Sequence, residues 1–384
     1  MTAVGDHLGT GDSGPDQRLV DALCHAAESE HGVTDTVVRS HLRRLAPLAS
    51  GPDGERLVRA AIARLDGLGP LDALLGDDHV DEVLVNADGQ VWTEVAGRAR
   101  RVGQLERADL AVVVERILAP LGRRLDRVSP VVDARLADGS RVCAVIPPVA
   151  ADGPCLAIRR FRDRALPLEA FCGPDVATLI DQALARRCNV VVGGATSSGK
   201  TSLLNTALGR TEPGERIVTV EDTAELLPRS DHLVRLEARP ATPDGLPAIT
   251  LEQLVRTAMR LRPDRLVVGE VRGAEVLGLV QALNTGHDGS WSTCHANGPL
   301  DVLHRLETLM LQAAPSWPLL AVRQHLARSI DLVVHVERTG SASRRVAEIA
   351  EVSGEPPTGL DGTITLRTLS TGDHVLAPIT RTRR

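Results

Sequence analysis

Apolar residues change their spacing along this chain of 384 residues. They recur at helical intervals over residues 18–48 and again over residues 56–65, after the breaking sequence Gly51-Pro52-Asp53-Gly54. Residues 1–17 are rich in Gly and Asp and have no apolar period. We therefore expect a disordered tail over residues 1–17 and a helical region over residues 18–69.

A period of two residues follows. Short alternating segments flank Asp88-Gly89 and Asp138-Gly139, as expected for two β-hairpins. A stretch with helical spacing, Asp109 to Leu118, lies between the hairpins, and Pro120 and Gly122 close it. The pattern predicts an α+β domain over residues 70–163.

Strands and helices alternate in the remainder, residues 164–384, as is typical of a parallel sheet in an α/β domain. Thr250 and Gln253 have the spacing of a capping box at the start of a helix. Gly and Pro near residues 354–362 set off a short C-terminal β-rich tail. The candidate strands of this domain are Asn189–Val192, Arg216–Val220, Arg265–Val268, Ser290–Thr293 and Asp331–Val336.

Composition limits the partners. The net charge is −6, so no basic excess favours nucleic acid, and no nucleic-acid partner is expected. With two Phe, three Trp and no Tyr, the core must consist of aliphatic residues, and a nucleotide base must be held by aliphatic or arginine contacts.

The six cysteines form no C-x-x-C pair, and we expect them to be reduced. A signal peptide and an apolar run of about 18 residues are both missing, so we expect an intracellular protein with at most peripheral membrane contact.

Of the 44 basic residues, a single one is lysine, and it lies in the segment Gly194-Ala195-Thr196-Ser197-Ser198-Gly199-Lys200-Thr201. This segment fits the phosphate-loop pattern G-x-x-x-x-G-K-[ST], and the strand before it and the helix after it argue against a chance match. Backbone N–H groups of such a loop form an anion cradle, Lys200 would neutralise the β- and γ-phosphates, and Thr201 would ligate Mg²⁺. The candidate nucleotide-binding residues are Gly194, Ala195, Thr196, Ser197, Ser198, Gly199, Lys200, Thr201 and Ser202.

Two acidic residues follow predicted strands. Glu221 comes after Ile217-Val218-Thr219-Val220, and Glu270 comes after Leu266-Val267-Val268-Gly269 in a Walker-B-like arrangement. Ligands of open α/β sheets bind at the carboxyl ends of the strands, so both side chains should face the phosphates. Either acid alone would be read as solvated, and the neighbouring loop favours a role in hydrolysis.

His287 and His295 bracket another short strand. A metal site with Cys294 is disfavoured, because adjacent strand residues point to opposite faces, and phosphate sensing or hydrogen bonding is favoured instead. Phosphoryl transfer often uses arginine as well, but 43 arginines leave the choice open. The arginine candidates are Arg135, Arg141, Arg159, Arg160, Arg256, Arg260, Arg262 and Arg272.

Four motifs occur in a specific order: the phosphate loop, the acidic segment Val220–Glu225, the segment Arg262–Gly273 and the segment Thr285–Asn297. In this order they resemble the type II/IV secretion-system ATPases over about residues 70 to 350. The segment Ser129–Arg141 is similar to the tight-adherence (Flp) pilus branch, which is CpaF-like.

The resemblance implies a RecA-like P-loop NTPase motor domain with a smaller α+β N-terminal domain, assembled as a homo-hexamer with ATP and Mg²⁺. It makes Glu221 and Glu270 the catalytic acids, with Glu221 and Thr201 at the metal. It makes His287 and His295 a histidine box, and it implies that Arg135 and Arg141 reach the nucleotide. Ala195 and Ser197 depart from the usual glycines of the loop, and the tetracysteine of the type II branch is missing.

The expected function is a cytoplasmic ATPase, peripheral at the inner face of the cytoplasmic membrane. It would power pilus assembly or protein secretion through inner-membrane platform proteins. The alternatives are a type IV conjugation-type secretion ATPase and a non-hydrolysing nucleotide-dependent regulator. A DNA motor is disfavoured by the charge and by the scarcity of aromatic residues.

Overall fold

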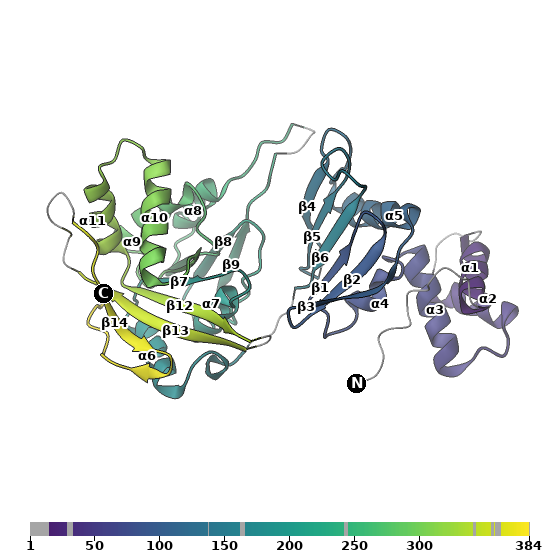
Figure 1. Cartoon of the computed structure of the whole chain (residues 1–384), viewed down its shortest axis with the longest axis horizontal. Helices are drawn as coiled ribbons and strands as arrows, with labels where there is room; N and C mark the ends of the chain where they lie inside the picture. Colours follow the sequence, from purple (N-terminus) through teal and green to yellow (C-terminus); the bar gives the residue numbers. More distant parts are fainter. Residues whose placement is uncertain are drawn as a thin grey trace. The chain divides into compact units, whose positions relative to one another are not determined.

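The computed structural model describes residues 15–28, 34–136, 138–161, 166–241, 245–340, 343–354, 357 and 362–383. The chain divides into two units, residues 1–161 and 162–384, and each is described by itself (Figure 1). The expected disordered tail lies outside the described residues up to residue 14, and a helix begins at Pro15.

The first unit starts with helices α1 (Pro15–Glu28), α2 (Asp35–Leu45) and α3 (Gly51–Leu65). Leu23, Val38 and Leu57 are among the buried residues of their common core. The sequence predicted a break at Gly51-Pro52-Asp53-Gly54, and this was wrong, because α3 begins at Gly51. Proline is tolerated in the first turn of a helix, where its missing N–H would have no partner in any case.

A six-stranded antiparallel sheet follows within the described part of this unit, in the order β3-β2-β1-β6-β5-β4. Both predicted hairpins are confirmed, as β1–β2 and as β4–β5. The exposed edge strand β3 was not predicted, because its sequence RARRVGQ has no apolar alternation. The elements are α4 (Leu71–Leu75), β1 (Glu82–Val85), β2 (Gln90–Val95), β3 (Arg98–Gln104), α5 (Arg107–Leu118), the 3-10 helix η1 (Ala119–Leu121), β4 (Val131–Arg135), β5 (Arg141–Val145) and β6 (Cys155–Arg159).

The second unit contains, in its described residues, a nine-stranded sheet in the order β15-β14-β13-β12-β7-β11-β10-β8-β9. The strands from β12 to β9 are parallel, and β13, β14 and β15 extend the sheet in antiparallel fashion. The predicted β-rich tail therefore belongs to the same sheet. The strands are β7 (Val190–Gly194), β8 (Ile217–Glu221), β9 (Leu233–Glu237), β10 (Arg265–Val268), β11 (Trp291–His295), β12 (Leu332–Thr339), β13 (Ser343–Val352), β14 (Leu366–Thr371) and β15 (His374–Val375).

Helices cover both faces of this sheet. Val190 and Val192 pack with α6 and α7, whereas Val191 packs in the core formed with α8, α9, α10 and α11. Burial on both faces explains why the parallel strands read as continuous apolar runs. The predicted capping box is confirmed, because Thr250 Oγ1 accepts from Gln253 N at 3.3 Å. The helices are η2 (Leu168–Ala170), α6 (Pro174–Ala185), α7 (Lys200–Leu208), α8 (Leu251–Met259), α9 (Glu275–Asn284), α10 (Pro299–Ala313) and α11 (Leu319–Ser329).

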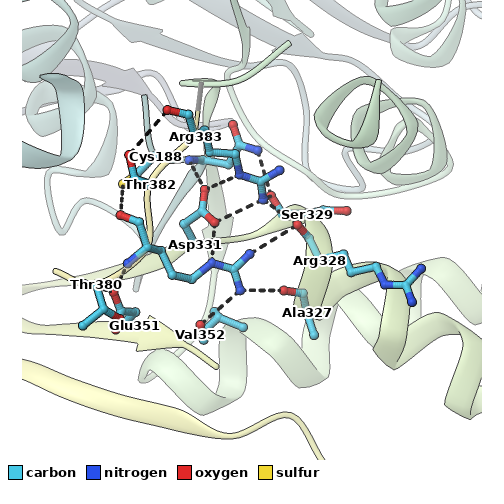
Figure 2. Close-up of polar contacts among 12 residues, drawn as sticks. Cys188, Ala327, Arg328, Ser329, Asp331, Glu351, Val352, Thr380, Thr382 and Arg383 are labelled. Carbon is cyan, nitrogen blue, oxygen red and sulfur yellow. Dashed lines mark hydrogen bonds and ion pairs between the residues drawn. The ribbon is translucent and has the colours of Figure 1, made fainter. Parts of the chain in front are cut away.

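A buried carboxylate, Asp331, is paired with Arg383 (Figure 2) and with Arg381. Its Oδ1 lies 2.6 Å from Arg381 Nε, and its Oδ2 lies 2.8 Å from Arg383 Nε. Asp331 Oδ2 also accepts from Asn189 N at 2.8 Å, just before β7. A carboxylate that is 1% exposed needs such partners, because an unpaired buried charge is very costly.

None of the described helices combines the length and the apolar character that crossing a bilayer requires.

Candidate active site

The phosphate loop connects the end of β7 to the start of α7 with close backbone packing. A Cβ on Gly194 would lie 2.4 Å from both Ser198 Oγ and Val336 O, so only glycine fits there. Gly199 has φ +99° and Ser197 has φ +58°, both in the left-handed region. Gly199 adopts this conformation readily, whereas Ser197 adopts it without being glycine.

Lys200 is 8% exposed and folds back over the loop. Its Nζ donates to Gly194 O at 2.9 Å and to Ala195 O at 2.8 Å, and it lies 3.4 Å from His295 Nδ1. Burial lowers the pKa of Lys200, and the charge of Glu270 opposes this effect. The ammonium group is therefore held by carbonyl oxygens at the loop, at the edge where β7 and β11 end.

His295 lies between Glu270 and Lys200. His295 Nε2 is 2.7 Å from Glu270 Oε1, although the two groups are not aligned as a hydrogen bond. Arg272 Nη2 donates to the other carboxylate oxygen of Glu270. Burial lowers the pKa of His295, and the charge of Lys200 acts in the same direction, so the neutral imidazole is favoured. Cys294 packs in the apolar core, as expected for the opposite face of β11.

Glu221 ends β8 and is 4% exposed. Its Oε1 accepts from Glu225 N at 3.0 Å and from Leu226 N at 2.9 Å. Its Oε2 is buried and has no hydrogen-bond partner among the described residues. Burial raises the pKa of Glu221 to about 7, against the two backbone bonds that lower it. A buried oxygen without a partner is destabilising, and a cation, a proton or a water molecule would satisfy it.

The structure does not bring His287 to this cluster within one chain. His287 N and Nδ1 both lie 3.3 Å from Ala282 O, at the end of α9. His287 precedes β11 and His295 ends it, so a strand of five residues separates them, which is roughly 13 Å at 3.3 Å per residue. The two histidines therefore lie at opposite ends of β11.

Arg135 and Arg141 are direct partners in the β4–β5 register of the first unit. In the same unit, Arg159 lies 3.6 Å from Glu82, and Arg160 Nη1 donates to Val80 O at 3.4 Å. Arg256 pairs with Glu252 on the surface of α8. Of the arginine candidates in the second unit, Arg272 contacts one of the predicted acids.

Arg344 is an additional residue at the loop that sequence reasoning missed. It belongs to β13, and its side chain packs against Gly199. No motif marks it, because arginine is the ordinary cation of this chain.

Relatives of the chain carry secretion and conjugation names. The putative conjugal transfer protein Rv3659c of Mycobacterium tuberculosis is 42% identical over 307 residues, which are 76% of this chain and 86% of the relative. The conjugal transfer protein TrbB of Rhizobium radiobacter is 34% identical over 300 residues, which are 75% of this chain and 89% of TrbB. The type IV secretion system protein PtlH of Bordetella pertussis is 32% identical over 319 residues, covering 73% of this chain and 93% of PtlH. None of these three names specifies the tight-adherence branch that the motifs predicted.

Solved structures show the fold. The Legionella pneumophila ATPase DotB matches with a TM-score of 0.54 and 20% identity, covering 73% of this chain and 79% of its own. The pilus retraction motor PilT with bound ADP matches with a TM-score of 0.51 and 17% identity, covering 80% of this chain and 81% of the PilT chain. The predicted α/β, RecA-like fold is confirmed.

The family model described as type II/IV secretion system protein matches residues 64–368. This match spans most of both units, and the relatives at 42% and 34% identity cover three quarters of the chain. The chain therefore belongs to the type II/IV secretion-system ATPase family.

Proposed function

We propose that this protein hydrolyses ATP and uses the energy to power pilus assembly or protein secretion through inner-membrane platform proteins. It would work on the cytoplasmic side of the membrane, associated with it peripherally. The observation that carries the proposal is the cluster of Lys200, His295 and Glu270 at the end of the phosphate loop.

The residues divide the chemical work. Backbone N–H groups of the loop and of the first turn of α7 bind the phosphates, and Lys200 exchanges its contacts with Gly194 O and Ala195 O for phosphate oxygens. Glu270 orients the attacking water and accepts its proton. His295, between Lys200 and Glu270, senses whether the γ-phosphate is present.

The residues also fit a bound Mg²⁺. Thr201 lies in the first turn of α7, and the buried Oε2 of Glu221 has no hydrogen-bond partner in the described part of the chain. A hydroxyl and a carboxylate oxygen are ligands that Mg²⁺ prefers, and Thr201 and Glu221 would hold the ion. When bound, Mg²⁺ neutralises the charge that develops on the phosphates.

We further propose that six copies form a ring and that Arg135 and Arg141 act on the nucleotide. Their direct pairing across β4 and β5 supports a joint role. Two guanidinium groups side by side form a cationic pair that suits a polyphosphate. His287 would act at a neighbouring subunit, or only in holding its own loop.

The tight-adherence branch is the favoured assignment, because the segment Ser129–Arg141 resembles it. Conjugation-type transport is the second candidate, because two relatives are named conjugal transfer proteins. Deleting the gene in its host separates the two. Loss of surface pili with unchanged conjugation supports the first candidate, and the reverse result supports the second.

The test of hydrolysis is phosphate release by the purified full-length protein with Mg²⁺ and ATP, beside a Lys200→Ala variant. Turnover that depends on Lys200 supports the enzyme. Tight ATP binding without turnover at any protein concentration would instead identify a nucleotide-dependent regulator.

A further inference from the structure

The β12–β13 hairpin brings an arginine onto the phosphate loop. β12 lies directly beside β7, the strand that leads into the loop. Arg344 on β13 is paired with Arg338 on β12, close to the turn of the hairpin. This hairpin is the long pair of strands next to β7 in Figure 1. The sheet order therefore places the start of β13 near the nucleotide site, although Lys200 and Arg344 are far apart in sequence.

The contact with the loop is close. A Cβ built on Gly199 would lie 2.5 Å from Arg344 Cδ and 3.4 Å from Arg344 Cγ and Nε. The aliphatic part of Arg344 thus packs over the glycine that precedes Lys200. Gly199 is needed for this approach as well as for its φ of +99°. The Arg344 guanidinium is carried to the same end of α7 whose N–H groups would bind phosphate.

The next residue along the strand behaves differently. Arg345 is exposed, and its Nε donates to Glu337 at 2.6 Å. Successive side chains of a strand point to opposite faces, so β13 turns one arginine toward the loop and the next one to solvent. Arg345 is therefore a matched control for Arg344 in residue type, strand and sequence position.

We propose that Arg344 binds the phosphates of a nucleoside di- or triphosphate at the loop, in the same chain as Lys200. The proposal rests on the nucleotide site described under the proposed function. The two cations have different shapes. Lys200 is a compact ammonium held by Gly194 O and Ala195 O, whereas Arg344 is a planar fork that matches phosphate oxygens in pairs. Arg344 would thus contribute to affinity for the phosphates independently of any neighbouring subunit.

The decisive variant is Arg344→Met in the full-length protein, because methionine keeps an aliphatic stem over Gly199 and removes the charge. Affinities for MgATP, MgADP and inorganic pyrophosphate are measured by calorimetry for the wild type, Arg344→Met, Arg344→Lys and Arg345→Met. We expect Arg344→Met to weaken all three ligands about tenfold or more, as for a lost charge-assisted hydrogen bond. Arg344→Lys should fall in between, and Arg345→Met should stay within about twofold, the effect of an exposed charge.

Pyrophosphate carries no base and no ribose, so it isolates the phosphate contact. If Arg344→Met weakens MgATP but leaves pyrophosphate unchanged, Arg344 contacts the nucleoside, and the proposal is overturned. Equal affinities of the wild type and Arg344→Met, while Lys200→Ala still loses binding, would also overturn it and leave the nucleotide site standing. A wild-type protein that binds none of the three ligands would refute the proposed function itself. Matching thermal unfolding of Arg344→Met and the wild type ensures that the comparison reports binding.

Discussion

His295 Nε2 lies 2.7 Å from Glu270 Oε1, which joins the end of β11 to the turn that follows β10. The other ring nitrogen of His295 lies 3.4 Å from Lys200 Nζ. The imidazole of His295 therefore contacts both Lys200, the cation of the phosphate loop, and Glu270, the acid proposed to orient the attacking water. A substitution of Lys200 or Glu270 should therefore alter the surroundings of the other residue through His295. The first two predictions concern these two residues.

Lys200→Ala should abolish turnover and weaken MgATP binding at least about tenfold, because it removes the ammonium beside the phosphates. Phosphate release and calorimetry measure the two effects. Arg210→Ala is the control, since Arg210 follows the far end of α7 and pairs with Asp181 near the surface. Unchanged turnover in Lys200→Ala would contradict the assignment of the loop.

Glu270→Gln should keep ATP affinity and lose turnover by at least ~10²-fold, the scale of a lost catalytic base. The side chain keeps its size, so only the charge and the proton acceptor are removed. Single-turnover kinetics beside an affinity measurement separates chemistry from binding. Near-normal turnover in Glu270→Gln would transfer the role to Glu221, and Glu252→Gln on the surface of α8 serves as the control.

The Glu221 carboxyl should make stability fall as pH rises. Burial raises its pKa from the ordinary 4.5 to about 7, so the folded state holds the proton more tightly than the unfolded state. Its stabilising contribution is complete below pH 4.5 and is lost as pH rises through about 7. The free energy of unfolding of the wild type, relative to Glu221→Gln, should therefore drop by about 3 kcal/mol over this window. Urea unfolding at several pH values measures it, and a constant difference would show that the carboxyl titrates normally.

Asp331→Ala should lower the free energy of unfolding of the second unit by about 3–5 kcal/mol, because it leaves Arg381 and Arg383 without their buried partner. Arg383→Ala should cost less, since Arg381 still pairs with the carboxylate. Denaturant unfolding gives both values. Arg210→Ala, which breaks a half-exposed pair with Asp181, should cost at most about 1 kcal/mol. A loss this small in Asp331→Ala would show that the buried carboxylate contributes little.

A chain of residues 166–384 alone should bind nucleotide weakly and hydrolyse it poorly, because it lacks Arg135 and Arg141. An arginine at the transition state is worth ~10³-fold or more in rate. In the full chain, Arg135→Ala and Arg141→Ala should each reproduce part of the loss without dissolving the hexamer, as judged by light scattering. Arg98→Ala on the exposed edge strand β3 is the control. Full activity of residues 166–384 as a monomer would refute both the ring and the arginine roles.

Local patterns were sufficient for much of the fold. The phosphate loop, the Thr250 capping box and the hairpins depend on residues close in sequence, so spacing alone predicts them. Glu221 and Glu270 follow from the rule that parallel strands end at a common edge. β3 was not predicted, because it is exposed and rich in arginine. A strand with no buried face shows no alternation of apolar and polar residues.

Long-range contacts were not predictable in this way. Asp331 meets Arg381, Arg383 and Asn189, and only the assembled sheet brings them together. Arg344 reaches Gly199 for the same reason. His287 and His295 show the opposite case, because the resemblance implied one histidine box, whereas β11 separates the two residues within one chain.

The sole lysine of the sequence has a practical consequence. Lys200 carries the one side-chain amine of this chain, and it sits in the phosphate loop. Biosynthetic incorporation of isotope-labelled lysine would mark this residue alone and would leave all of its N–H donors in place. A single lysine side-chain spin system would then report nucleotide arrival and departure. Exchange would be visible by NMR spectroscopy without any engineered label and with every arginine in place.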